Sequence, residues 1–350
     1  LMTWETIQSW NAGIDWIALN GRFTGAIDLF KRVTKDMIGP APELSSILGT
    51  GVPKVNNADM ESYGWELELN WRDQINAFSY GVKLVLSDDQ QRVTRYPNES
   101  YNLNSWYNGR KNGEIWGYTT VGIAKSDAEI QQHLEKNRPS WGSNWAAGDI
   151  MYKDLNDDGV VNNGENTLAN YGAVSMIGGS TPAYKFGVTL DGAWNGFDVR
   201  MFLQGVAKRD YVLGGAYFWG ADAGGMWQSA GFVDHWDFFR SEDNPLGPNL
   251  NSYYPRPLFG NGKNQYTQTK YLQNAAYLRL KNIQLGYTLP KSVVHKASME
   301  NVRFYISGDN LLTFSQISGI FDPELLGGDW GAGKLYPLSK VISLGLNINF

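Results

Sequence analysis

The sequence of 350 residues contains no cysteine and only three histidines. Without cysteine the chain has no disulfide bonds, thiolate metal sites or cysteine nucleophiles, and it is compatible with a compartment outside the reducing cytosol. The histidines, at positions 133, 235 and 295, lie in no metal-binding or nucleophile pattern. The sequence therefore predicts neither an enzyme nor an organic cofactor.

The sequence also lacks a continuous apolar run of the roughly 18 residues that a membrane-spanning helix needs. Its 30 Lys and Arg residues are scattered among 35 Asp and Glu residues, and the net charge is −5. Because there is no basic cluster, no nucleic-acid partner is expected. Leu1 is followed directly by strand-like sequence without the features of a signal peptide, so we expect the chain to start inside a longer protein or to be processed.

Glycine and aromatic residues are abundant instead, with 40 glycines and 14% Phe, Trp and Tyr, which favours β structure. In the segment 184–194 every second residue from Tyr184 to Trp194 is apolar, aromatic or glycine, and Lys185 and Asp191 lie between them. Such alternation predicts strands with one apolar face. About nine segments share it: 6–17, 22–34, 63–71, 78–86, 184–194, 197–204, 276–288, 302–308 and 341–350.

The strand pattern fits a membrane β-barrel. The ten steps from Tyr184 to Trp194 cover about 33 Å of strand, and at a tilt of roughly 45° they rise about 24 Å, the height of an outer-membrane apolar band. Charges such as Glu66 and Glu68 on the opposite face need water, and the chain ends at an aromatic residue, Phe350. We therefore predict an all-β fold, a transmembrane antiparallel β-barrel. Nine strands are an odd number, so the chain would supply the C-terminal portion of a larger barrel of about 22 strands.

The connections alternate between short and long. Tight turns are predicted at Asn20-Gly21, Asp73-Gln74 and Asn195-Gly196, and a modest turn at 290–300. The long connections are 35–60, 89–181, 211–274 and 313–338. In an outer-membrane barrel the short turns face the periplasm and the long loops face outward, so the segment 89–181 is expected to be a long extracellular loop.

This loop contains a calcium-type motif at 154–165, DLNDDGVVNNGE, which fits the twelve-residue pattern D-x-[DN]-x-[DN]-G-x5-E. A glycine at the sixth position permits the sharp turn, and oxygen atoms at alternate positions suit a hard cation. We expect a structural Ca²⁺ ion there; the alternative is a solvated turn rich in Asp, Asn and Gly. The predicted ligands are Asp154, Asn156, Asp158, the carbonyl of Val160, Asn162 and Glu165.

Aromatic side chains are frequent in the long loops. They are suited to stacking on sugar rings or to clamping a partner; the alternative is ordinary packing of the large loops upon themselves. The candidate ligand or partner residues are Trp106, Trp116, Trp219, Trp227 and Trp236.

The chain resembles, from end to end, the C-terminal part of the SusC/RagA family of TonB-linked outer-membrane transporters. The resemblance rests on VNNADMESYGWELELNW at 55–71, GDIMYKDLNDDG at 148–159 and the run at 178–211. It continues through YLRLKNIQLGYTLPKSV at 277–293, FYISGDNLLTFS at 304–315 and the end of the chain.

The resemblance implies a place in the outer membrane of a Gram-negative bacterium and the import of oligosaccharides or peptides. It also implies the partners of such a transporter: a plug and further barrel strands, a SusD-like surface lipoprotein, TonB-ExbB-ExbD acting through the plug, and membrane lipid. The plug and the N-terminal strands have no counterpart in residues 1–350. A passive porin and a soluble carbohydrate-binding β-sandwich are the alternatives.

Overall fold

A computed structural model describes residues 2–40, 54–220, 231–258, 260–327 and 335–350. The predicted all-β fold is confirmed: nine antiparallel strands form one sheet in the order β1-β2-β3-β4-β11-β12-β15-β16-β17. Each predicted strand segment corresponds to one of them. Their bounds are β1 Thr6–Ala18, β2 Phe23–Gly39, β3 Val55–Ile75, β4 Phe78–Arg95, β11 Ala183–Trp194, β12 Phe197–Lys208, β15 Tyr277–Thr288, β16 Asn301–Ser315 and β17 Val341–Asn349.

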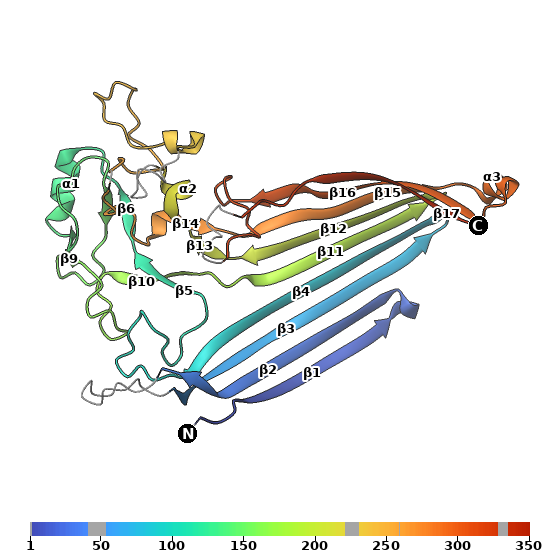
Figure 1. Cartoon of the computed structure of the whole chain (residues 1–350), viewed down its shortest axis with the longest axis horizontal. Coiled ribbons are helices and arrows are strands. Elements are labelled where there is room, and N and C mark those ends of the chain that lie inside the picture. Colours follow the sequence, from blue (N-terminus) through green and yellow to red (C-terminus); the bar gives the residue numbers. More distant parts are fainter. Residues whose placement is uncertain (1, 41–53, 221–230, 259, 328–334) are drawn as a thin grey trace.

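The sheet is open and curved, with β1 and β17 at its two edges (Figure 1). The short connections, helix α3 (Lys291–Val294) and the C-terminus lie at one end of the strands, and the long loops lie at the other (Figure 1). The alternation of short and long connections predicted from the sequence is therefore present in the structure.

The two faces of the sheet differ in chemistry because the strand register keeps like residues side by side. Leu190 lies opposite Met201 on β12 and opposite Val82 on β4. Its neighbour Asp191 lies on the other face, opposite Arg200. The apolar face is open: Leu190 is 37% exposed and Leu344, on β17, is 84% exposed.

A β-sandwich would bury this apolar face beneath a second sheet. In the described part of the chain, the other sheets have only two strands each, and they lie in the loops beyond the end of the large sheet (Figure 1). The sandwich alternative is therefore wrong for the arrangement found here.

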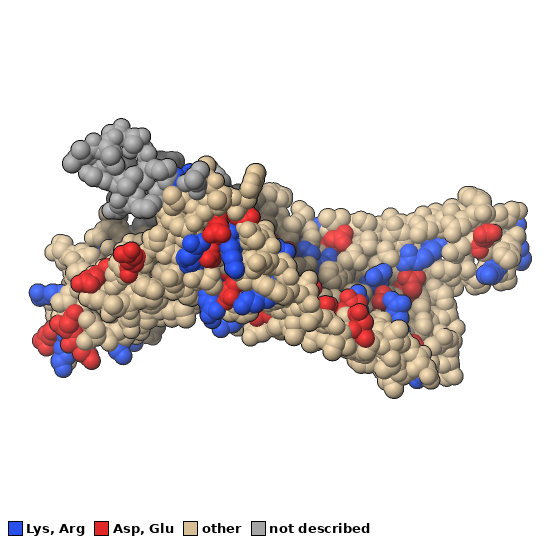
Figure 2. Space-filling view, turned by 90° about the horizontal axis from the view of Figure 1, so that it is seen from below, with Lys and Arg blue, Asp and Glu red and all other residues tan. Residues whose placement is uncertain are grey.

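The charged face is held by ion pairs between adjacent strands and, in the case of Arg303 on β16 and Asp198 on β12, across the intervening strand β15. Lys83 lies 2.7 Å from Glu68, Arg303 lies 2.6 Å from Asp198, and Arg200 lies 3.5 Å from Asp191. Acidic and basic side chains are mixed over the surface seen in Figure 2. A face of this kind needs water or a polar partner, as the interior of a wide barrel provides.

Two of the three predicted tight turns are confirmed. The φ angles are 57° at Asn20 and 84° at Gly21, and they are 47° at Asn195 and 86° at Gly196. Positive φ angles of this size are the left-handed geometry of a hairpin turn. The prediction at Asp73-Gln74 is wrong, because β3 continues to Ile75 and the turn is formed by residues 76 and 77. Asn76 takes the positive φ of 54° there, which asparagine tolerates better than most residues.

Strands β2, β3 and β4 continue past the ends predicted from alternation. β4 runs to Arg95 and so enters the range 89–181 that the sequence assigned to loop; the segment outside the sheet is 96–182. The extension is held by polar side chains: Arg92 pairs with Glu61, and Arg95 lies 2.7 Å from Asp59. Apolar alternation does not detect such a segment.

The long loops fold together into one body with its own core, which we call the loop module: the described residues of 96–182, 209–276 and 316–327. Its core joins side chains from all three segments, including Tyr152, Phe218 and Leu326, each no more than 1% exposed. It contains α1 (Asp127–Leu134), α2 (Gly215–Trp219) and four small sheets. Their strands are β5 Glu114–Tyr118, β6 Thr120–Ile123, β7 Arg138–Pro139, β8 Ile150–Tyr152, β9 Val160–Val161, β10 Val174–Gly179, β13 Asp210–Val212 and β14 Leu272–Asn274. Among the described residues, no helix is both long enough and apolar enough to cross a membrane.

Candidate functional site

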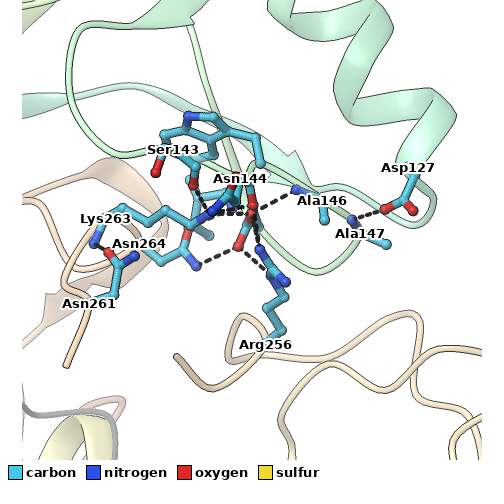
Figure 3. Close-up of polar contacts among 12 residues, drawn as sticks. Asp127, Ser143, Asn144, Ala146, Ala147, Arg256, Asn261, Lys263 and Asn264 are labelled. Carbon is cyan, nitrogen blue, oxygen red and sulfur yellow. Dashed lines mark hydrogen bonds and ion pairs between the residues drawn. The ribbon is translucent and has the colours of Figure 1, made fainter. Parts of the chain in front are cut away.

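A fully buried carboxylate joins two distant segments of the loop module. Asp149 accepts hydrogen bonds from Arg256 at 2.8 and 2.9 Å and from Asn264 at 3.0 Å. Its second oxygen also lies 2.8 Å from the Nζ atom of Lys263. Arg256, Lys263 and Asn264 come from a different segment of the chain from Ser143 and Asn144, and the two groups meet in one cluster (Figure 3). The cluster fixes the position of Arg256, Lys263 and Asn264 against residues 143–149.

The charges in this cluster compensate one another. Burial alone raises the pKa of Asp149, but hydrogen bonds from Arg256, Asn264, Lys263 and the backbone N–H of Ala146 outweigh it, so the pKa is lowered. Lys263 is itself 3% exposed and donates to the carbonyl oxygens of Ser143 and Asn144 at 2.9 and 3.0 Å. The cluster therefore has a structural role, and the sequence did not predict it.

Beside the segment 253–257 the loop module contains an apolar pocket of about 470 Å³. We call it the aromatic pocket. Trp219, at the end of α2, and Trp236, in a 3-10 helix at Val233–Trp236, both line it. Its other main walls are Phe232, Val233, Leu246 and Tyr254. Helix ends and turns position these rings, and the Trp236 side chain is 59% exposed.

His235 also lines this pocket, and both of its ring nitrogens are used. Nδ1 accepts the backbone N–H of Phe232 at 3.0 Å, and Nε2 lies 3.2 Å from the carbonyl oxygens of Tyr217 and Phe218. These partners match a neutral ring protonated at Nε2. His235 therefore holds the pocket wall together through hydrogen bonds.

The structure separates the tryptophans that the sequence grouped. Trp219 and Trp236 share the aromatic pocket, whereas Trp106 lies under Arg110, whose guanidinium carbon is 5.4 Å from the ring centroid. Trp116 donates to Glu114 at 3.3 Å and packs against the core of the loop module. Trp227 lies outside the described residues. Phe232, Val233 and Leu246 were not predicted as site residues, because only the fold brings them to Trp219.

The calcium-type motif has a preformed first half. Asp154 is 4% exposed and accepts the backbone N–H groups of Asn156 at 3.1 Å and of Gly159 at 2.7 Å. Gly159 has a φ of 84°, the sharp turn expected at the sixth position. Asp158 accepts the N–H of Val160 at 2.7 Å and an amide proton of Asn156 at 2.8 Å. The loop thus curls around Asp154.

The second half of the motif is less gathered. Asn162 accepts the backbone N–H of Gly164 at 2.7 Å, and Glu165 is exposed. In the described part of the chain no three side chains of the types Asp, Glu, His and Cys gather closely enough to hold a metal ion. Coordination would therefore require the predicted ligand side chains to come closer together, and the Ca²⁺ ion stays a prediction.

No family model matches the chain. Among curated proteins, the chain is 24% identical over 376 residues to the TonB-dependent receptor P3 of Formosa agariphila, and the match covers all of this chain and 34% of that protein. It is 23% identical over 365 residues to the TonB-dependent receptor SusC of Bacteroides thetaiotaomicron, again over all of this chain and 32% of that protein. The chain thus spans about a third of the length of these relatives.

Among solved structures, one described as the RagAB peptide transporter matches with a TM-score of 0.72 at 22% identity. The match covers 99% of this chain and 36% of that one. The resemblance to the SusC/RagA receptors is confirmed, and the fold corresponds to part of an outer-membrane barrel with its loops.

Proposed function

We propose that this chain, which resembles SusC/RagA receptors along its whole length, forms part of a TonB-dependent transporter that imports nutrients across the outer membrane. The observation that carries the proposal is the two-faced sheet. Leu190 and its neighbours offer an open apolar surface to lipid, while Asp191 and its neighbours offer ion-paired charges to a hydrated interior.

The edges of the sheet support a larger barrel. Among the residues that the structure describes, strand β1 pairs with β2 alone and β17 pairs with β16 alone, so each presents an unpaired edge. Unsatisfied backbone groups are costly within a bilayer, so membrane-spanning sheets are closed. We therefore propose that further barrel strands pair with β1 and β17 and that a plug fills the charged interior. TonB-ExbB-ExbD would act through that plug.

The loop module is the proposed contact region outside the membrane. Its compact core and buried Asp149 cluster hold the aromatic pocket in a fixed position at the loop end of the barrel. We propose that it faces a SusD-like surface lipoprotein and the imported substrate, an oligosaccharide or a peptide. A Ca²⁺ ion at 154–165 would stiffen one corner of the module, and the preformed turn at Asp154 and Gly159 supports this role.

The test combines localisation with energy coupling. The protein should sediment with the outer membrane, need detergent for solubility and co-purify with a surface lipoprotein. Nutrient-dependent growth that requires the gene should also require TonB. Growth that persists without TonB would favour a passive porin, and a protein that stays soluble without detergent would overturn the membrane assignment.

A further inference from the structure

The apolar face of the large sheet carries an aromatic residue at the same level on five adjacent strands, from β4 to β16. The strand register places these residues side by side in the order Phe78, Trp194, Phe197, Tyr287 and Phe304. We call them the aromatic row. The row lies at the short-turn end of the sheet (Figure 1). Rows of rings of this kind mark the level at which the apolar layer of a membrane meets water.

Charged residues appear beyond the aromatic row. Lys291, Lys296 and Glu300 are exposed in the connection between β15 and β16, past Tyr287 on the first strand and before Phe304 on the next. Their charges have both signs, so this connection favours no particular lipid headgroup. The row therefore marks the boundary of the apolar zone, and in the orientation proposed above this boundary is the periplasmic one.

On the loop side of the aromatic row the same face is hollowed into a groove of about 650 Å³, a volume within the usual range of ligand pockets. We call it the apolar groove. Its floor is the next row of residues, formed by Gly192, Val199, Leu285 and Ile306. Gly192 contributes no side chain, and a Cβ atom there would lie 3.7 Å from the ring of Phe78. The ring therefore borders the space that the missing side chain leaves open.

The lining of the apolar groove favours hydrocarbon. Trp194 and Phe197, two of its walls, are 55% and 57% exposed. Asp198 and Tyr305 also border the groove, but the register puts both on the charged face. There Arg303 donates to Asp198 at 2.9 and 2.6 Å and lies over the ring of Tyr305. The other lining residues in the described part of the chain are apolar, aromatic or glycine. A ligand without polar groups therefore fills this space without losing hydrogen bonds.

The shape of the groove, and not its hydrophobicity, has to account for a lipid held at this place. Lipid chains are as apolar as the groove, so a chain that moves into it from the bilayer gains no hydrophobic free energy. A chain that packs between the standing rings and a floor that includes glycine touches protein atoms on more than one side, and each contact adds dispersion energy. A flat strand surface offers contacts on one side only.

We infer that the apolar groove holds an acyl chain of a phospholipid of the periplasmic leaflet, and that this lipid stays bound when the protein is extracted from the membrane. The groove is continuous with the apolar surface that the sheet offers to lipid, and it lies directly beside the periplasmic boundary. The inference rests on the proposed function, which places this face against the bilayer, and goes beyond it by assigning a defined lipid site.

The experiment is native mass spectrometry of the protein purified from outer membranes in a mild detergent, with extraction of the bound lipid to identify it. Gly192→Leu fills the groove with a side chain, and Trp194→Ala removes one of its walls. Ala12→Leu is the matched control, because Ala12 is an exposed residue of β1 that lies opposite Leu29 on the apolar face and does not line the groove. Circular dichroism checks that each variant keeps its β structure.

The unmodified protein and Ala12→Leu should retain a single phospholipid to the same extent. Gly192→Leu should lower the phospholipid-bound fraction about fivefold or more, because the added side chain overpacks a filled site, and Trp194→Ala should lower it about two- to fivefold. Absence of bound lipid from the unmodified protein, a bound glycolipid in place of phospholipid, or equal retention by Gly192→Leu and Ala12→Leu would overturn the inference. The TonB-dependent growth that tests the proposed function does not depend on this lipid, so failure of one is distinguishable from failure of the other.

Discussion

The carboxylate of Asp149 and the guanidinium of Arg256 meet through two parallel hydrogen bonds of 2.8 and 2.9 Å across 107 residues of sequence. Asp149 is completely buried. A two-pronged contact of this kind fixes orientation as well as distance, so the pair sets how the loops after β4 and β12 lie against each other. The aromatic pocket is built on the same arrangement.

Replacement of Asp149 by Asn should loosen the loop module. The amide keeps the shape but leaves Arg256 and Lys263 without their counter-charge, and breaking a buried pair typically costs about 3 to 5 kcal/mol. We expect faster hydrogen exchange throughout 140–150 and 256–264, with strand exchange unchanged. Asp157→Asn, at an exposed loop position, is the control. Equal exchange in the two variants would contradict a structural role for Asp149.

The same carboxylate should make the loop module sensitive to acid. Since the pKa of Asp149 is lowered in the folded protein, its stabilising contribution is complete above the ordinary carboxyl pKa of about 4. The contribution is lost as the pH falls through the lowered folded-state pKa. Pepsin cleavage of the loop module should therefore accelerate as the pH falls below about 4. The Asn variant should show a shallower acceleration, and identical pH profiles would refute the assignment.

The two confirmed Asn-Gly turns should respond differently to the same substitution. Gly21 and Gly196 have φ angles of 84° and 86°, so alanine adds left-handed strain of about 1 to 2 kcal/mol at either position. At Gly196 the new Cβ would also lie 2.7 Å from the carbonyl oxygen of Thr288, whereas at Gly21 nothing lies within 4 Å. Gly196→Ala should lower the urea midpoint of unfolding more than Gly21→Ala; equal midpoints would show that the crowding is relieved at no cost.

Calcium should protect the loop around 150–170 from proteolysis. Removal of calcium by a chelator should expose that segment in the unmodified protein without unfolding the barrel. Asp154→Ala combined with Asp158→Ala should be cleaved equally with and without calcium, while Asp157→Asn should keep the protection, because position four of the motif is not a ligand position. Cleavage of the unmodified protein that ignores the chelator would rule out the ion.

The sheet could be predicted from the sequence because strands with one apolar and one polar face alternate strictly, as Tyr184 to Trp194 do. The prediction fails where that constraint ends. Residues such as Arg92 and Arg95 extend β4 through ion pairs with β3. The position of the turn between β3 and β4 depends on which residue adopts a positive φ angle, and that residue is Asn76, not Asp73. Apolar alternation carries no information on φ.

The site was less predictable because its contacts are not local. Trp219 and Trp236 were candidates as aromatic residues of the long loops, but nothing in their spacing showed that they share a pocket with Leu246. Lys263 lies 114 positions from Asp149 and has no pattern that marks it as buried. The motif at 154–165 was visible because all its groups are close in sequence.

The most direct test of the central claim is spin-label accessibility along β11, and the absence of native cysteine makes single-cysteine labelling straightforward. Labels at Val188, Thr189, Leu190 and Asp191 would be placed in the protein reconstituted in lipid. We expect collisions with oxygen, which concentrates in lipid, at Val188 and Leu190, and collisions with a water-soluble nickel chelate at Thr189 and Asp191. Accessibility without this alternation, or with the reverse alternation, would contradict a membrane-spanning sheet with the sidedness assigned here.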